Sequence, residues 1–309
     1  MSYEGDMFKK LGMPSKMDVE LAILKTLFKN NGTIKEFASG EEIVTEIANL
    51  FSLNEEQRHS VLERIYYKEN RIAKTPVWHR LLYRAADSLA NENLITRPST
   101  TYKLTNKKEW MLTEAGIDKS LNILNIPSAT KENLSVKSFE VQKLVNKMKL
   151  SKYPNIYDPF KKEKQTKFIL KEHSLRERGF RQIVIESYDC KCSLCGLKLP
   201  SPNNLLWEVE AAHIVPHRLN GKDEIWNGIA FCKLHHWAFD VGWFSLTNDY
   251  KIIVSKNYND LPENFGKMLE IDFLLNKLRA DNPISLPTLK DLNPHIAALE
   301  WHRKNVLFK

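Results

Sequence analysis

Three cysteines and one histidine in the second half of the chain form two short pairs. The pair Cys192-x-x-Cys195 is followed, after 36 intervening residues, by Cys232-x-x-His235. Two pairs of soft ligands, each presented by one short loop, can enclose a tetrahedral zinc ion. Three of the four cysteines lie within six residues, which favours a metal site over a disulfide framework. We therefore predict structural zinc, with Cys190 as a spare thiol.

A second motif lies around these pairs. Residues 207–244 read WEVEAAHIVPHRLNGKDEIWNGIAFCKLHHWAFDVGWF, which resembles the HNH (ββα-metal) endonuclease family, in particular its restriction-type members. The resemblance places the motif residues at His213, Asn227 and His236, and the carboxy-terminal LNPHIAALEWHRKNVLF resembles the ending of many such proteins. It implies hydrolysis of DNA phosphodiester bonds with a catalytic divalent ion such as Mg²⁺. Asn227, in the turn between two strands, is expected to hydrogen-bond the backbone and keep the His213 loop in shape.

Phosphodiester hydrolysis needs a base that deprotonates water and a divalent cation that neutralises the departing oxygen. His213 ends a strand expected over 207–214, and we assign it as the general base because a neutral imidazole accepts a proton near physiological pH. His236 opens a helix directly after the second zinc pair, so we assign it to the catalytic metal. Asp240 lies on the same helical face four residues later and is the second candidate ligand. Because His235 directly precedes His236, the two histidines can also exchange roles.

One position departs from the family pattern. Many members have an acidic or histidine metal ligand immediately before the first motif histidine, and this chain has Ala212 there. Glu210, on the same strand face, or Asp240 can replace that ligand, or His213 itself can bind the ion. Asp240 can instead cap its helix or form a salt bridge. The sequence leaves these alternatives open.

The first 125 residues alternate helical patterns with short strand-like segments. Apolar residues repeat with helical spacing from Asp18, over 43–51 and from Pro76 onwards. A helix is expected over 113–121, and the strand-like segments before it are 94–96, 102–104 and 111–112. Three helices followed by a small hairpin is the order of a winged helix, whose third helix contacts DNA.

The third of these helices has a polar face that suits contact with DNA. Arg80, Tyr83 and Arg84 lie opposite its apolar residues, so we expect them to bind DNA. The segments LLYRAADSLANENLI and WMLTEAGI resemble the amino-terminal winged-helix domain of Mrr-type restriction enzymes, which implies a DNA-recognition domain. The same fold can instead serve as a dimerisation or scaffold module, because a fold alone does not fix function.

The middle of the chain is strongly basic. Residues 131–180 contain 13 Lys and Arg against six Asp and Glu, and they include the proline-interrupted run SKYPNIYDPFKKEKQTK. We expect a basic linker over 126–170, in which Lys161 and Lys162 contact DNA phosphates. A solvated linker without such contacts is the alternative.

The whole chain has a formal charge of +8, which favours a polyanionic partner. It has no apolar run of about 18 residues, the length that spans a membrane. The amino terminus lacks the basic and apolar layout of a secretory signal. We therefore expect a cytoplasmic protein that does not contact membranes.

These features predict an α+β protein with a winged-helix DNA-recognition domain over 1–125 and a zinc-stabilised ββα-metal nuclease domain over 171–309. The expected function is restriction, the cleavage of foreign double-stranded DNA at a short site, and the resemblance to Mrr-type enzymes adds recognition of methylated bases as an option. Cutting both strands requires two active sites, so we expect a homodimer on DNA. Two alternatives are a zinc-containing DNA-binding regulator without cleavage and an HNH nicking or homing-type nuclease.

Overall fold

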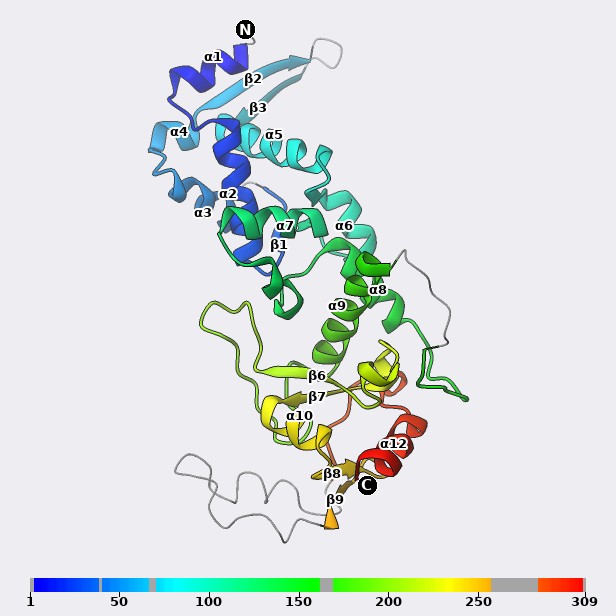
Figure 1. Ribbon diagram of the computed structural model, residues 1–309. Coiled ribbons are helices and arrows are strands. Elements are labelled where there is room, and N and C mark those ends of the chain that lie inside the picture. Colours follow the sequence, from blue (N-terminus) through cyan, green and yellow to red (C-terminus); the bar gives the residue numbers. More distant parts are fainter. Residues whose placement is uncertain (1–2, 39–40, 67–70, 162–168, 257–282, 308–309) are drawn as a thin grey trace, which may run out of the picture. The chain divides into compact units, whose positions relative to one another are not determined.

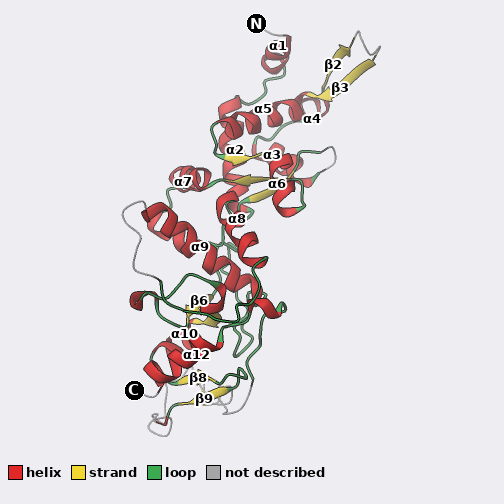
Figure 2. Cartoon of the chain, turned by 90° about the vertical axis from the view of Figure 1, so that its right-hand side faces the viewer, coloured by secondary structure: helices red, strands yellow, loops and turns green. Residues whose placement is uncertain are grey.

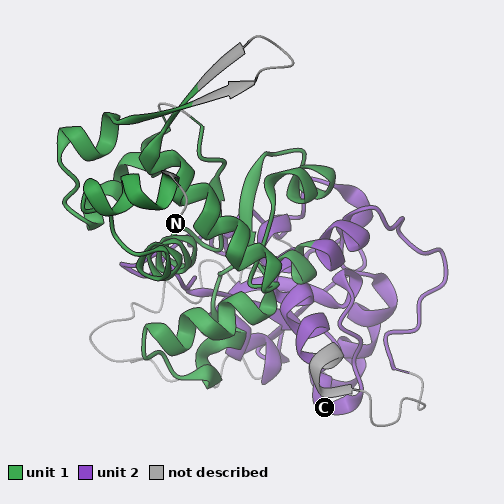
Figure 3. Cartoon of the chain, turned by 90° about the horizontal axis from the view of Figure 1, so that it is seen from above, with its two compact units in different colours: residues 1–142 green, residues 143–309 purple. Residues whose placement is uncertain are grey.

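The computed structural model describes residues 3–38, 41–66, 71–161, 169–256 and 283–307. The chain divides into two compact units, Met1–Gln142 and Lys143–Lys309 (Figure 3). No helix in these described stretches is long and apolar enough to cross a membrane.

Unit 1 combines helices with a three-stranded antiparallel sheet (Figure 1). The sheet order is β1-β5-β4, with Ile34 opposite Trp110 and Ile95 opposite Leu112. Its strands are β1 (Thr33–Lys35), β4 (Ile95–Thr96) and β5 (Glu109–Leu112). A separate antiparallel hairpin, β2 (Val61–Tyr66) with β3 (Arg71–Pro76), projects beside the helices (Figures 1 and 2). The helices are α1 (Tyr3–Lys10), α2 (Lys16–Lys29), α3 (Glu42–Leu50), α4 (Glu55–His59), α5 (Val77–Asn91), α6 (Pro98–Thr105), α7 (Glu114–Ile123) and the 3-10 helix η2 (Ser128–Asn133).

The core of unit 1 lies between α2 and α5. Ile23 and Leu27 on α2 and Leu82 on α5 are completely buried. Each such aliphatic side chain contributes about 1.5–3 kcal/mol when it leaves water. Trp78 on α5 is also buried, and its indole Nε1 donates a hydrogen bond of 3.2 Å to the carbonyl of Val44 on α3. The helix predicted from Pro76 is confirmed, because α5 begins directly after that proline.

The predicted hairpin at the end of unit 1 is only partly correct. Residues 94–96 and 111–112 do contribute to the paired strands β4 and β5, but residues 102–104 belong to helix α6. Pro98 occupies the first turn of α6, where a fixed φ and a missing N–H favour a helix. Asn106 ends the helix in the left-handed region, at φ 59°. These start and stop signals outweigh the short strand-like pattern between them.

Unit 2 is built on two small antiparallel sheets, β6 with β7 and β8 with β9. Helix α8 (Phe139–Lys149) crosses the boundary between the units in sequence. The strands are β6 (Val209–His213), β7 (Gly228–Cys232), β8 (Phe244–Leu246) and β9 (Ile252–Val254). The other helices are α9 (Ile169–Ser187), α10 (Lys233–Asp240) and α12 (Ile296–His302), with short helical turns η3 (His217–Leu219), η4 (Ile225–Asn227), η6 (Lys290–Leu292) and η7 (Arg303–Leu307).

An aromatic cluster with rings from β7, α10 and β8 lies in the core of unit 2. The rings of Phe231, Phe239 and Phe244 lie 5.3–5.6 Å apart in tilted or edge-on contact. His302 on α12 stacks on Phe239 with 3.7 Å between ring centroids. Its Nδ1 accepts a hydrogen bond from the Ser245 hydroxyl, and its Nε2 donates to the carbonyl of Phe239. The carboxy-terminal helix is thereby fixed to the strands of this unit.

Residues 151–161, which we call the connecting segment, belong to unit 2 and pack against its later residues, although the sequence predicted a linker over 126–170. Tyr153 stacks on His295 with a centroid distance of 4.8 Å. Phe160 contacts Trp301 edge-on at 6.1 Å, and its backbone bridges to Gly221. The prolines and lysines around these aromatic residues suggested a solvated chain, but the aromatic side chains supply enough apolar area to hold the segment on the surface of unit 2.

Because burial lowers the pKa of His302 to about 3, the folded chain keeps this side chain neutral. The unfolded chain binds a proton there below the ordinary histidine pKa of about 6.5, so acid favours unfolding. We expect the free energy of unfolding to fall between pH 6.5 and 5 more steeply in wild type than in His302→Gln, by up to about 1.4 kcal/mol per pH unit. Urea unfolding at several pH values, with bound metal measured at each, tests this. Parallel pH curves for the two proteins would contradict it.

Candidate functional site

The β6–β7 hairpin and helix α10 form a ββα arrangement in unit 2 (Figure 1). β6 ends at His213, which lies opposite Gly228 at the start of β7. β7 ends at Cys232, which lies opposite Val209 and is the N-cap residue of α10. The hairpin therefore places His213 at one end, whereas the metal-ligating pair Cys232 and His235 lies at the other.

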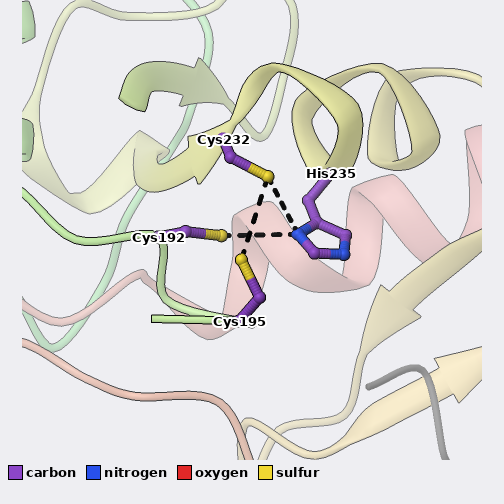
Figure 4. A group of neighbouring side chains, drawn as sticks. All are labelled: Cys192, Cys195, Cys232 and His235. Carbon is purple, nitrogen blue, oxygen red and sulfur yellow. Dashed lines mark hydrogen bonds between the residues drawn. The ribbon is translucent and has the colours of Figure 1, made fainter. Parts of the chain in front are cut away.

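Cys192, Cys195, Cys232 and His235 converge in one cluster, with all four ligand atoms within 4.8 Å of one another (Figure 4). The Nδ1 atom of His235 lies 3.5 Å from the sulfur of Cys192 and 3.1 Å from that of Cys232. The sulfurs of Cys195 and Cys232 are 4.0 Å apart. Tetrahedral zinc with ordinary bond lengths spaces its ligand atoms by about 3.5–3.8 Å. The four side chains therefore fit one tetrahedral metal ion.

A tight loop presents the first two ligands of this cluster. Gly196 adopts a φ of +76°, which an L side chain rarely tolerates, and its N–H donates to the carbonyl of Cys192. The N–H of Ser193 donates to the carbonyl of Ala230 on β7 at 2.8 Å. The loop is thus fastened to the strand that leads to Cys232. Cys190 lies outside the metal-binding group.

The thiols of the cluster compete for protons. Hydrogen bonds from Cys195 and then Cys232 hold the pKa of Cys192 far below its ordinary value, and the neighbouring Cys192 raises the pKa of Cys232. Thiolates rather than thiols bind metals. The thiolate form of Cys192 is therefore favoured even without a metal ion. A bound cation would favour the thiolate form of Cys195 and Cys232 as well.

His213 is held on two sides. Its Nε2 lies 3.0 Å from Oδ1 of Asp223, and its ring stacks on Phe180 of α9 with a centroid distance of 4.1 Å. The second oxygen of Asp223 accepts a hydrogen bond of 2.8 Å from Nζ of Lys161 in the connecting segment. Burial raises the pKa of Asp223, but the hydrogen bonds from His213 and Lys161 outweigh it and bring the pKa to about 2. Asp223 is therefore ionised at neutral pH.

Gly228 allows α9 to approach the hairpin closely. A Cβ atom at this position would lie 2.5 Å from Cγ2 of Val184 and 2.7 Å from Cε2 of Phe180. Both distances are shorter than real contacts, so any larger residue displaces α9 or the hairpin. The absence of a side chain at Gly228 is thus what lets Phe180 reach the ring of His213.

Asn227 is completely buried and binds the loop between the two strands. Its Oδ1 accepts from the N–H of Val215 at 2.8 Å, and its Nδ2 donates to the carbonyls of Val215 and Lys222, each at 3.0 Å. The amide therefore joins the residues that follow His213 to those that precede β7. Removing it would leave buried backbone groups unsatisfied.

His236 contacts two carboxylates. Its Nδ1 lies 2.9 Å from Oε2 of Glu210 on β6, and its Nε2 lies 3.5 Å from Oδ2 of Asp240 on the same helix. Burial lowers the pKa of His236, but the hydrogen bond to Glu210 and the charges of both carboxylates raise it above its ordinary value overall. The hydrogen bond to His236 lowers the pKa of Glu210, whereas burial raises that of Asp240. Ala212 is fully buried and carries no ligand atom.

In the part of the chain that the structure describes, the Cys₃His cluster is the only group of three or more His, Cys, Asp or Glu side chains whose ligand atoms converge on a metal position. His236 and Asp240 bring two ligand atoms to one position on α10. Mg²⁺ usually takes only one or two carboxylates from a protein and fills its shell with water and substrate oxygens. The pair therefore fits a sparse magnesium-type site better than a closed structural one.

The residues of α5 predicted to contact DNA are engaged with other parts of unit 1. Arg80 and Arg84 share the carboxylate of Glu4 on α1, with nitrogen–oxygen distances of 3.0 Å and 3.4 Å. Tyr83 is half-buried, and its ring lies 5.6 Å from that of Phe37. Arg84 keeps the larger exposed fraction of the two arginines, 55% against 24% for Arg80.

Lys161 does not lie on an open basic surface. Its Nζ is paired with the carboxylate of Asp223, which is almost completely buried. A lysine that neutralises a buried carboxylate does not offer a free charge to a phosphate, so the predicted role of this side chain in DNA binding changes to one inside the site. Lys162 lies outside the described residues.

Sequence reasoning missed Asp223 and Phe180. Asp223 is one of two acidic residues in the loop NGKDEIWNG, and no spacing rule connects a loop carboxylate to His213. Phe180 reads as one more apolar residue of an amphipathic helix. The only available signal was their chemistry, a carboxylate and an aromatic ring, which are common partners of a functional histidine.

The comparison with protein families decides what kind of domain this is. Residues 192–247 match a family model described as HNH endonuclease. This segment is an HNH endonuclease domain. It contains the whole Cys₃His cluster together with His213, Asn227 and His236.

Similarity to whole proteins is weaker. A solved structure described as "Modification dependent TagI restriction endonuclease" is similar at 19% identity and a TM-score of 0.31 over 41% of this chain. The match spans 37% of that protein's length. No curated protein sequence matches the chain significantly.

The Cys₃His cluster predicts one tightly bound metal ion per chain. We expect Cys232→Ser to lose this ion and to lower the free energy of unfolding by more than about 4 kcal/mol, the range in which loss of a bound metal falls. Elemental analysis of protein purified without chelator, together with denaturant unfolding, measures both effects. Cys190→Ser is the matched control, because it removes a nearby thiol outside the cluster and should keep the ion. Metal-free wild type, or equal metal loss in both variants, would contradict the assignment.

Proposed function

We propose that this protein is a DNA endonuclease of the restriction type that hydrolyses phosphodiester bonds with His213 as general base. The observation that carries the proposal is the HNH endonuclease domain at residues 192–247, which includes both His213 and His236 on a ββα arrangement. Each histidine is paired with a carboxylate, so each ring is held by a partner and can serve as a positioned reactive group.

We propose zinc as the ion of the Cys₃His cluster. Zinc has no redox chemistry, and it accepts three thiolates and one imidazole in tetrahedral geometry. With all four protein ligands in place, no position is left for water, which is typical of a structural and not a catalytic ion. Its role would be to fix the loop of Cys192 and the first turn of α10 against β7.

His236 and Asp240 would hold the second ion, which we propose to be Mg²⁺ or a similar divalent cation. When bound, the ion supplies positive charge that stabilises the phosphate as its ester oxygen departs. Glu210 accepts a hydrogen bond from Nδ1 of His236, which leaves Nε2 as the ligand atom beside Asp240. Glu210 would thus orient His236, and it would not itself replace the metal ligand that many family members carry at the position of Ala212.

The substrate we propose is double-stranded DNA, selected by unit 1. Helices α2, α3 and α5 together with the sheet order β1-β5-β4 support a winged-helix assignment with α5 as the recognition helix, in which α4 and the β2–β3 hairpin are additions before α5. Helix α6 lies between β4 and β5, where the sequence predicted a further strand of the wing. Two chains would be needed to cut both strands, so we propose that a homodimer acts on DNA. Recognition of methylated bases remains part of the proposal because of the likeness of unit 1 to Mrr-type sequences.

Cleavage of plasmid DNA tests the enzymatic proposal. We expect discrete fragments with Mg²⁺ or Mn²⁺, none with EDTA, and a loss of at least about 100-fold in rate for His213→Ala, as for the removal of other general bases. His59→Ala, an exposed histidine of unit 1, is the matched control and should cut normally. Plasmid from methylating and non-methylating hosts shows whether modification is required.

The other outcomes of this experiment separate the alternatives. Binding without cleavage under every condition would favour a DNA-binding regulator. Conversion of supercoiled plasmid to open circles only, or a single cut at a long site, would favour a nicking or homing-type nuclease. Full activity of His213→Ala would refute the assigned base.

The salt dependence of DNA binding tests the recognition helix. Each phosphate contact contributes a slope of about −0.9 to the plot of log binding constant against log salt. We expect Arg80 and Arg84 to exchange Glu4 for DNA phosphates on binding. Arg80→Ala with Arg84→Ala, in a His213→Ala background that does not cut, should then reduce the slope by about 2. Lys25→Ala with Lys29→Ala, on α2, removes the same charge and should leave the slope nearly unchanged. Equal slopes in both double variants would exclude α5 as the DNA-contacting helix.

A further inference from the structure

We propose that Asp223 and Lys161 are positioning residues that hold His213 with its Nε2 protonated, so that Nδ1 is the atom that accepts the proton of water. The inference rests on the proposed nuclease function and names which atom of the base reacts. It concerns two residues outside the HNH motif, one in the loop after β6 and one in the connecting segment.

Asp223 lies between His213 and Lys161 and contacts each of them through a different carboxylate oxygen. Oδ1 of Asp223 lies 3.0 Å from Nε2 of His213, and Oδ2 lies 2.8 Å from Nζ of Lys161. Only 4% of the Asp223 side chain is exposed, so water does not solvate this carboxylate effectively. A buried carboxylate needs a compensating charge and donors for its oxygens. Lys161 and His213 supply both, one to each oxygen.

The ionised state of Asp223 determines which nitrogen of His213 carries the hydrogen. An ionised carboxylate only accepts hydrogen bonds, so the nitrogen that faces it must carry the hydrogen. Asp223 is ionised at neutral pH, because its pKa lies near 2. Nε2 of His213 is therefore the donor, and in the neutral ring Nδ1 keeps the lone pair. None of the described residues hydrogen-bonds to that Nδ1 atom.

The stacking on Phe180 and the contact with Asp223 together hold the ring in one orientation. The face of His213 stacks on Phe180 at an interplanar angle of 22°. A ring flip about the Cβ–Cγ bond would move Nε2 away from Asp223 and leave the buried carboxylate without one of its two partners. Such a loss costs about 1–3 kcal/mol or more for a charged group. The ring orientation is therefore fixed before substrate binds.

Backbone pairing delivers Lys161 to this position. The N–H of Lys161 donates to the carbonyl of Asn220 at 2.7 Å, and the N–H of Lys222 donates to the carbonyl of Pro159 at 2.9 Å. The connecting segment thus pairs with the loop that carries Asp223, directly beside that residue. Its lysine completes the site and is not a free phosphate ligand.

This arrangement determines the path of the proton during the reaction. As the water oxygen bonds to phosphorus and the bond from phosphorus to the leaving oxygen breaks, one water proton passes to Nδ1 of His213. The ring becomes an imidazolium with Nε2–H still directed at Asp223, whose charge stabilises it. The leaving oxygen takes a proton from solvent, and His213 returns its proton to solvent before the next turnover.

Asp223→Asn tests the proposal, because the amide keeps the shape but can direct its NH₂ group at Nε2 and favour the wrong tautomer. We expect single-turnover cleavage at saturating DNA to slow by about 10- to 1,000-fold, within the losses known for carboxylate partners of functional histidines. DNA affinity should stay unchanged, and the acid limb of the rate–pH profile should move to lower pH. Lys161→Met should slow cleavage less, and Lys161→Arg should restore most of the rate.

The tautomer itself is read by nitrogen-15 NMR of histidine-labelled protein, with His213→Gln used to assign the signals. We expect wild type to show the Nε2–H form at neutral pH and Asp223→Asn to lose its dominance. This readout does not depend on cleavage, so it distinguishes failure of the inference from failure of the nuclease proposal. Metal content and circular dichroism establish that each variant is folded, and Lys161→Met gives an independent test if Asp223→Asn is not.

Three results would overturn the proposal. The first is an Nδ1–H tautomer in wild type. The second is a folded Asp223→Asn variant that cleaves at the wild-type rate with the wild-type pH profile. The third is a Lys161→Met variant whose only defect is weaker, less salt-dependent DNA binding, because that would make Lys161 a phosphate contact.

Discussion

The convergence of three thiols and one imidazole is the constraint on which the rest of unit 2 depends. The four ligands come from a loop before the hairpin, the end of β7 and the first turn of α10, so one ion would connect all three elements. These elements are short, and their hydrogen bonds alone would hold them weakly. Once β7 and α10 are joined at Cys232, the register of the hairpin determines where His213 lies, and the first turn of the helix determines where His236 lies.

Each of the two histidines near the hairpin has a carboxylate as its partner. His213 is paired with Asp223 and His236 with Glu210. The hydrogen bond to His236 lowers the pKa of Glu210, and, despite the opposing effect of burial, the hydrogen bonds to His213 and Lys161 lower that of Asp223. One of these carboxylates, Glu210, comes from strand β6, and the other, Asp223, comes from the loop that joins β6 to β7. Phe180 and Gly228 add a steric constraint, since the helix can approach His213 only where the strand has no side chain.

The parts of this arrangement that the sequence could predict are the local ones. The spacing of Cys192, Cys195, Cys232 and His235 predicted a metal cluster, and helix α5 followed from the proline and the apolar spacing after it. Asp223 was missed because the conformation of the loop between β6 and β7 brings it to His213, and no local sequence pattern predicts that conformation. The docking of residues 151–161 was missed because the lysines and prolines dominate their composition while Tyr153 and Phe160 determine their packing. Helix α6 was read as a strand because a short pattern was weighed above the signals of Pro98 and Asn106.

We propose that unit 2 holds two different ions for two different purposes, one closed within the Cys₃His cluster and one at His236 and Asp240 that is open to DNA. A crystal structure with Mn²⁺ and a phosphorothioate DNA duplex, recorded at the zinc and manganese absorption edges, tests it most directly. The account predicts a zinc signal among Cys192, Cys195, Cys232 and His235, and a manganese signal at Nε2 of His236 and Asp240 with a DNA phosphate near Nδ1 of His213. A manganese signal within the cysteine cluster only, or a DNA backbone that passes far from His213, would contradict it.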